Sequence, residues 1–232
     1  MKVIKNNTKM TIIANTIIFS VTWGMCHLLK STVLKRYNFN TSYFLLHFLV
    51  NCVITSMCFP YFLTLFKDPN GIESEYEEYG YIRYSFPIIA SLHTFHLYNC
   101  YDSINLDEII HHIVTYIFWI IHYYLHHPFY YVSLICMSGV PGGITYLMLF
   151  MQKHNMISSL NEKYYSMMLN FWMRGPGCII YSTLLYDRMI YMNDNNFCPI
   201  HLFLIGFTAL NGIHFTTTIV ESYYRTLYSK TN

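Results

Sequence analysis

Long apolar stretches separated by short polar segments dominate the chain, and seven of them match the roughly 20 residues that a bilayer-spanning helix needs. These stretches occupy residues 11-29, 43-66, 84-101, 108-127, 129-151, 165-187 and 199-221. Most connections between them are short, which favours an up-and-down bundle with antiparallel neighbours. The pattern therefore predicts an all-α fold, a polytopic membrane bundle of about seven transmembrane helices.

One long polar connection, residues 67-83, interrupts this pattern with a run of acidic side chains, which is typical of a solvated loop. Basic residues are divided almost evenly between the two sides of the predicted bundle. The positive-inside rule therefore leaves the orientation in the membrane open. The oligomeric state is open as well, with a homodimer as one option.

Composition agrees with a lipid-embedded chain. Hydrophobic residues make up 54% of the sequence and charged residues only 11%, against roughly a quarter in a soluble domain. The net charge is +2 and the basic residues are scattered, which gives no basic surface for nucleic acid. Seven cysteines without CxxC spacing favour small buried side chains over disulfides.

The third and fourth apolar stretches carry most of the candidate chemistry. Seven of the 12 histidines lie between residues 93 and 127. Ionisable groups are costly inside a bilayer, so such a concentration indicates a functional site. On one helix, Asp107, His111, Thr115 and His122 fall within an arc of about 80°.

Asp107 and His111 are spaced i,i+4, so the carboxylate can orient the imidazole as an orienter does for a general base. We therefore expect His111, His112 and Asp107 to be catalytic, with Thr115 and His122 in contact with substrate. His126 and His127, beside Pro128, are better explained as interfacial side chains.

Further polar residues in the apolar stretches are candidates for the same site. His96 and Asp102 end the third stretch, where the short connection brings them back toward the fourth. Arg174, with Asn170 one turn before it, requires a partner, water or an anionic ligand. The remaining candidates are Asn211 and His214. The alternatives are a satisfied core histidine for His96, a structural ion pair for Arg174, and bonding between helices for Asn211 and His214.

Residues 139-143 (GVPGG) predict a break in the fifth helix near the middle of the membrane. Irregular backbone at that depth has to be covered by protein or to line a wet cavity. We expect this break either to line the same interior as the histidines or to pack closely against a neighbouring helix.

Residues 111-115 (HHIVT), preceded by Asp107 and Ile110, resemble the double-histidine motif of the TLC domain. That domain is shared by ceramide synthases, translocon-associated TRAM proteins and related lipid-linked membrane proteins. Residues 210-215 (LNGIHF) in the last helix are similar to the family as well. The resemblance divides the chain into an N-terminal tail with a first helix (1-39), a TLC-like domain (40-225) and a C-terminal tail (226-232).

The resemblance implies six helices around a cavity, residence in the endoplasmic reticulum or another endomembrane, and membrane lipids as partners. For the ceramide-synthase branch it implies acyl transfer from acyl-CoA, as co-substrate, to a lipid amine or hydroxyl. His111 and His112 would carry the reaction, with no bound metal or other cofactor. Ceramide synthases have a second, acidic motif where this chain reads GVPGGITY (139-146), which leaves another lipid substrate or a non-catalytic role open.

Two other interpretations remain. A membrane di-iron desaturase or hydroxylase uses histidine boxes, and residues 93-96 (HTFH) and 122-127 (HYYLHH) have related spacing. A non-enzymatic protein for lipid sensing, lipid transfer or cargo escort would keep the cavity without turnover.

Overall fold

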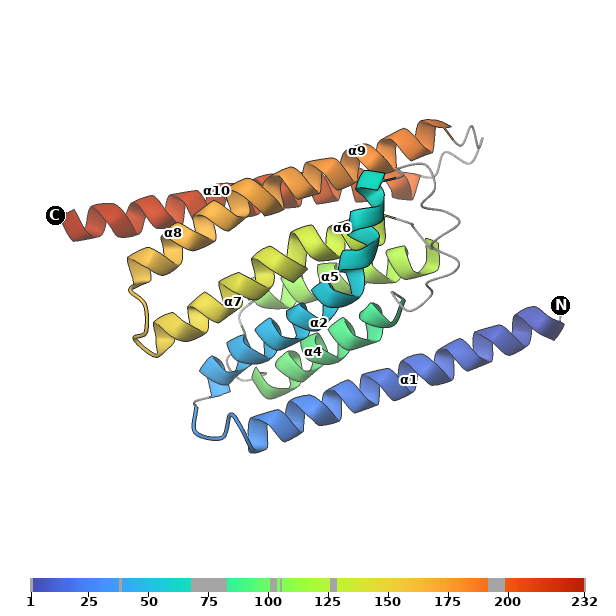
Figure 1. Ribbon diagram of the computed structural model, residues 1–232, viewed down its shortest axis with the longest axis horizontal. Coiled ribbons are helices and arrows are strands. Elements are labelled where there is room, and N and C mark those ends of the chain that lie inside the picture. The colour runs from blue at the N-terminus through green and yellow to red at the C-terminus, as the bar shows by residue number, and fades with distance from the viewer. Residues whose placement is uncertain are drawn as a thin grey trace.

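All regular secondary structure in the described part of the chain is helical (Figure 1). The computed structural model describes residues 2-37, 39-67, 83-100, 104, 106-125, 129-191 and 199-231. The elements are α1 (Lys2–Ser31), α2 (Phe39–Lys67), α4 (Ser85–Cys100), α5 (Leu106–Leu125), α6 (Tyr130–Ser133), η2 (Leu134–Gly139), α7 (Val140–Lys153), α8 (Ser159–Leu169), η3 (Asn170–Arg174), α9 (Gly175–Tyr191) and α10 (Pro199–Thr231).

Each of the seven predicted stretches coincides with one helix or one continuous run of helices. The fifth stretch corresponds to α6, η2 and α7, and the sixth to α8, η3 and α9. α10 continues to Thr231, ten residues beyond the end of the seventh predicted stretch. Most of the acidic connection, Asp102 and the side chain of Asp107 lie outside the described residues.

The predicted break at residues 139-143 is wrong in form, because the helix continues through these residues. It widens instead into the π-helical turn η2, and η3 is a second π-helical turn in the neighbouring helix. Each π turn ends two residues before a proline, Pro141 or Pro176. Proline has no backbone N–H and its ring crowds the preceding turn, so the helix adjusts upstream instead of ending.

Four helical segments are long and apolar enough to cross a membrane: Thr11–Ser31, Thr41–Leu65, Tyr130–Lys153 and Pro199–Ser229. In the first, only 6% of the most apolar window is buried, and Ile12, Ile17 and Val21 are more than half exposed. A continuous apolar surface of this kind is rare on soluble proteins. It is typical of a helix that faces lipid.

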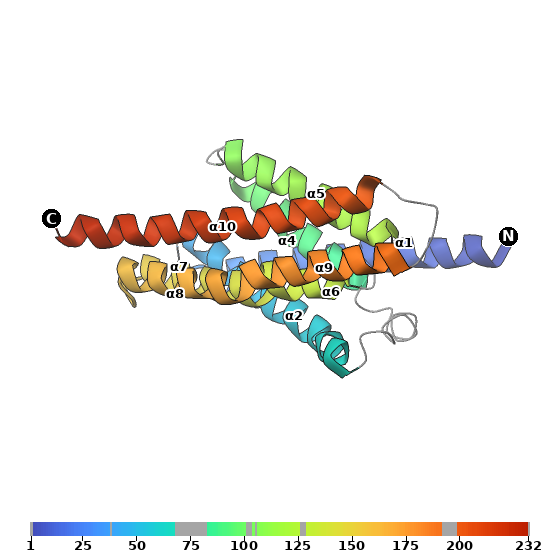
Figure 2. The same ribbon diagram turned by 90° about the horizontal axis from the view of Figure 1, so that it is seen from above.

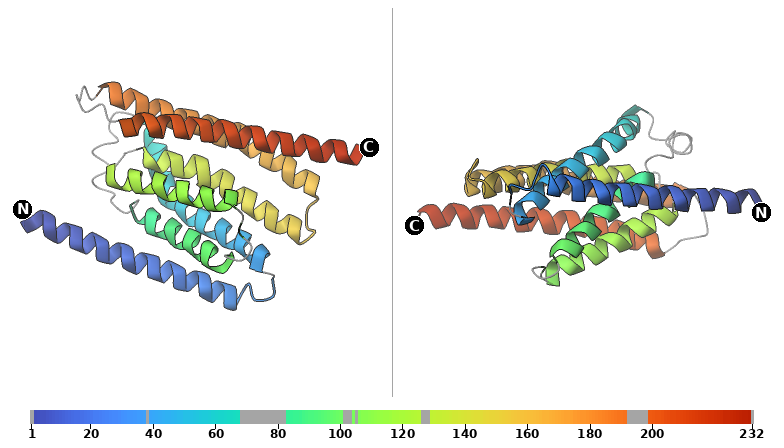
Figure 3. Two further views of the ribbon diagram at one scale, coloured as in Figure 1. Left: turned by 180° about the vertical axis from the view of Figure 1, so that it is seen from behind. Right: turned by 90° about the horizontal axis from the view of Figure 1, so that it is seen from below.

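The helices run roughly along one axis, with α1 at an edge of the bundle (Figure 1). α1 packs against α4, α2 against α7, and α10 against both α8 and α9. Viewed from behind, α5 lies between α4 and α10 (Figure 3). The C-terminal part of α2 diverges from α10, as the view from above shows (Figure 2).

Aromatic side chains form the centre of the larger core, where α2, α5, α6, η2, α9 and α10 meet. Tyr131 and Tyr181 are fully enclosed there, with Ile54 and Leu204 beside them. A smaller core joins α1, α2 and α4. α4 and α5 also contribute side chains to the larger core, and Val50 on α2 packs against both cores.

Two glycines allow three helices to approach closely. Gly177 on α9 faces Cys136 on η2, and a Cβ at Gly177 would overlap the cysteine side chain. On α10, a Cβ at Gly212 would lie 2.6 Å from Cys178 Cβ on α9. Small residues at such crossings are what membrane helices use to maximise van der Waals contact.

We expect Gly212→Ala to destabilise the folded protein, because the new methyl group has to displace Cys178. Overpacking of this kind costs about 1–3 kcal/mol. Gly206→Ala, on the same helix, is the matched control, since no atom lies within 4 Å of its added Cβ. The unfolding midpoint in detergent should fall for Gly212→Ala and stay level or rise for Gly206→Ala; equal shifts would contradict this packing.

Candidate functional site

A cavity of about 390 Å³ lies inside the bundle. Its described lining residues come from α2, α4, α5, η2, α7, η3 and α10, and none comes from α1. The apolar part of the lining is Val50, Ile89, Leu92, Phe118, Trp119, Met137, Leu149, Phe207, Phe215 and Ile219. The polar part is His47, Asn51, His93, His111, Thr115, Ser138, Thr145, Tyr146, Arg174, Asn211 and Thr218.

Five histidines from three helices gather at one side of this cavity: His47, His93, His96, His111 and His112. We call them the imidazole cluster. The ring centroids of His93 and His112 are 4.8 Å apart, and their Nδ1 atoms form a 2.6 Å hydrogen bond. His96 is 5.0 Å from His112, and His47 is 5.7 Å from His93, centroid to centroid.

The two histidines of the double-histidine motif have different surroundings. His112 is only 3% exposed and is held by its hydrogen bond to His93, in which one Nδ1 donates and the other accepts. His111 is exposed and lines the cavity, with its ring 5.6 Å from that of His112. His111 is therefore the member of the pair that a ligand in the cavity can reach.

His96 belongs to the imidazole cluster but lies farther from the cavity than His93 and His111. Its ring packs edge-on against Tyr43, with centroids 3.8 Å apart, and it is buried. Its Nδ1 has no hydrogen-bond partner among the described residues. His96 does not line the cavity, so it contributes to the cluster through its contact with His112.

The predicted helical face on α5 is divided by the structure. Thr115 lines the cavity together with His111. His122 is instead buried against α9, where Nε2 hydrogen bonds with the Tyr181 hydroxyl and Nδ1 with the Phe118 carbonyl oxygen. With both ring nitrogens engaged, His122 serves helix packing.

Arg174 lines the cavity at the end of η3. Its Nε donates to the Met137 carbonyl oxygen at 3.0 Å, and its guanidinium carbon lies 5.0 Å from the Phe215 ring centroid. In an α-helix the Met137 carbonyl would accept from residue 141, which is proline and has no N–H. Arg174 Nε therefore donates a hydrogen bond to a carbonyl for which the proline at position 141 offers no backbone N–H.

The other candidates from the sequence differ in position. Asn211 lines the cavity. Asn170 is buried: its Nδ2 donates to the Ser166 backbone carbonyl one turn earlier, and its backbone carbonyl accepts from Thr216 on α10. His214 is exposed on α10 and does not line the cavity. Asn211 therefore fits a binding role, while Asn170 fits a role in helix packing.

Carboxylates are scarce in the described part of the site. Asp102 and the side chain of Asp107 lie outside the described residues, so the pairing of Asp107 with His111 stays a prediction. Among the carboxylates that are described, Glu162, Asp187 and Glu221, none lines the cavity. The described His, Cys, Asp and Glu side chains form no group of three or more arranged to hold a metal ion.

Sequence reasoning did not single out His47 and Asn51, which belong to the site. Both lie on α2, spaced i,i+4, and both face the cavity. Polar side chains at that spacing in an otherwise apolar helix were the available signal. It was weak because α2 carries no recognisable motif.

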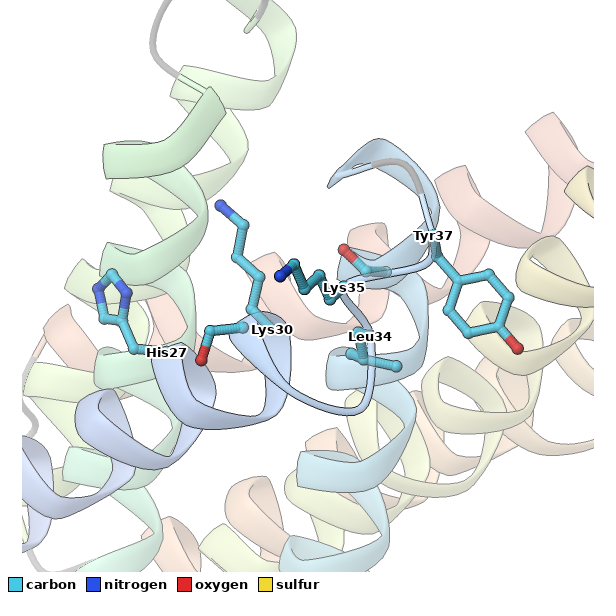
Figure 4. Close-up of a pocket in the computed structure, with 7 residues that line it drawn as sticks. His27, Lys30, Leu34, Lys35 and Tyr37 are labelled. Carbon is cyan, nitrogen blue, oxygen red and sulfur yellow. The ribbon is translucent and has the colours of Figure 1, made fainter.

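A second pocket, of about 330 Å³, lies outside the bundle centre, where α1 leads into α2 (Figure 4). His27, Lys30, Lys35 and Tyr37 line it. The Lys30 amine donates to Asn99 Oδ1 on α4 at 2.9 Å, which ties the end of α1 to the bundle. This pocket contains none of the candidate residues from the sequence.

Comparison of the chain with protein-family models, with curated proteins and with solved structures gives no match. The resemblance to the TLC domain therefore depends on the double-histidine motif and its surroundings. The geometry of the cavity has to carry the functional argument.

The different surroundings of His111 and His112 predict different effects on stability. His112→Ala removes a buried ring and leaves the half-buried His93 Nδ1 without this partner, which costs about 1–3 kcal/mol. His111→Ala removes a more exposed ring and should change stability much less. Unfolding midpoints of the two variants in the same detergent check this; a larger loss for His111→Ala would contradict the assignment.

Proposed function

We propose that this chain is an integral membrane protein with seven bilayer-crossing helices, which binds a lipid in its central cavity and transfers an acyl group with His111. The cavity carries this proposal. Its volume falls within the range of small-molecule sites, and its lining combines large aliphatic and aromatic side chains with convergent polar groups.

The course of the chain supports seven crossings. α1 begins at one end of the long axis and α10 ends at the other, as an odd number of crossings requires (Figure 1). α4 and α5 are shorter and carry histidines. On α5, however, the apolar residues Ile110, Ile113 and Ile117 are exposed, as lipid-facing residues would be. The helices other than α1 supply the cavity lining, in agreement with the six-helix bundle that the TLC resemblance implies.

The imidazole cluster provides the chemistry. His111 accepts the proton of a lipid amine or hydroxyl as that group attacks the thioester carbon of acyl-CoA. The carbon–sulfur bond then breaks, and the CoA thiolate takes the proton from the imidazolium. His112 is held by its hydrogen bond to His93, and its ring packs beside that of His111, with the two centroids 5.6 Å apart. Residence in an endomembrane follows from the TLC resemblance.

A non-enzymatic lipid carrier is the second candidate. The observation that favours it is the lack of a carboxylate among the described lining residues, so that a base in this cavity has no described acidic orienter. The carrier would use the same cavity and the same lipid, without turnover.

The test is lipidomics on cells that express the wild-type chain, His111→Ala, or the double variant His111→Ala/His112→Ala. Removal of a general base lowers activity by about 10²- to 10⁴-fold, so we expect an acylated lipid class to rise only with the wild type. His201→Ala is the control, because His201 lies at the start of α10 and does not line the cavity.

Two results would contradict acyl transfer. If both His111 variants change the cellular lipids as the wild type does, His111 is not the base. If no lipid class changes but lipid copurifies with every variant, the carrier is the better description.

A further inference from the structure

Among the described residues that line the cavity, Arg174 is the one with a permanent charge. None of the described carboxylates pairs with it: Glu162 pairs with Lys163, Glu221 pairs with Arg225, and Asp187 is exposed on α9. A charge inside a membrane bundle is costly unless it is paired or binds a ligand. The cavity therefore offers a positive charge to whatever occupies it.

The guanidinium is held in a fixed orientation. Nε donates to the Met137 carbonyl, and the guanidinium carbon lies 5.0 Å from the Phe215 ring centroid. A guanidinium has five N–H donors, so this contact leaves the terminal nitrogens to donate elsewhere. A terminal pair held in this way suits a planar or tetrahedral oxyanion, which accepts two parallel hydrogen bonds.

A second donor group lies close to these nitrogens. A Cβ built on Gly142 would be 3.7 Å from Arg174 Nη2 and 3.6 Å from Asn51 Nδ2. Both side chains thus border the same small space, which glycine keeps free of a side chain. Arg174, Asn51 and Gly142 all line the cavity, and we call this place the guanidinium end.

The guanidinium end adjoins the imidazole cluster. The ring of Phe215 is in contact with both, because its centroid lies 5.0 Å from the guanidinium carbon and 6.3 Å from the His111 centroid. On α2, Asn51 is one turn beyond His47. A single ligand can therefore reach both ends.

From this geometry, we propose that the guanidinium end binds the oxyanion of a single-chain anionic lipid, a carboxylate or a phosphate monoester. The alkyl chain lies along Phe118, Trp119, Ile89 and Phe207, the apolar part of the lining. This proposal rests on the proposed function, since it specifies the chemical class of the lipid that the cavity binds.

The test measures the affinity of the detergent-purified, full-length chain for palmitate, hexadecyl phosphate, hexadecanol and inorganic phosphate. The three lipids have the same alkyl chain and differ in the head group. We expect both anionic lipids to bind at least tenfold more tightly than hexadecanol, and inorganic phosphate to compete poorly. Equal affinity for anions and alcohol would overturn the guanidinium end while leaving lipid binding in the cavity intact.

Single substitutions then test whether Arg174 causes the preference for anionic lipids over hexadecanol. Arg174→Gln should lower the affinity for both anionic lipids about tenfold and leave that for hexadecanol within about twofold. Arg225→Gln is the matched control, because Arg225 is exposed and pairs with Glu221. If Arg174→Gln fails to fold, Gly142→Val fills the same space and should cause the same selective loss.

The remaining outcomes are also decisive. Unchanged preference in variants that fold would overturn the assignment to Arg174. Competition by inorganic phosphate as strong as that by hexadecyl phosphate would overturn a lipid as the source of the anion. Failure of all three lipids to bind would overturn the proposed function together with this subsite.

Discussion

The hydrogen bond from Arg174 to the Met137 carbonyl is the contact on which the centre of this bundle depends. Backbone polar groups at membrane depth have to be satisfied by the protein, because lipid offers no partner. Pro141 removes the N–H that an α-helix would direct at Met137. The donor to this carbonyl comes from the neighbouring helix: Arg174, the last residue of η3, donates to Met137 on η2. A structural constraint on one helix thus places a charge in the cavity.

The bundle is closely packed where η2, α9 and α10 meet, and it encloses a cavity beside α5. Gly177 and Gly212 bring η2, α9 and α10 into contact around Cys136 and Cys178. α5 reaches that side through Phe118, which contacts Phe207 on α10, and through His122, which hydrogen bonds with Tyr181 on α9. The cavity lies where α5 stands off from α7 and η3. Gly177 and Gly212 therefore set the close approach of η2, α9 and α10.

Apolar runs were sufficient to predict every helical stretch, because run length and hydrophobicity are local properties. Of the candidate residues, His111, Thr115, Arg174 and Asn211 line the cavity. His122 instead bonds with Tyr181 on α9, and Asn170 is buried away from the cavity. A helical wheel gives the angle of a side chain on its own helix. It does not say which neighbour covers that angle, and α9 covers His122. His47 was missed for the same reason, since only tertiary packing brings α2 beside α4.

The spacing of the two polar ends limits the chemistry that the proposed ligand can undergo. His47 and Asn51 are four residues apart on α2, a rise of about 6 Å. A lipid whose oxyanion lies at Asn51 and Arg174 would have its next few atoms near His47 and His111, with the rest of its chain among aromatic rings. A base at His111 would then act on a group close to the head of the lipid. A reaction far along the alkyl chain, as in a mid-chain desaturation, would be out of its reach.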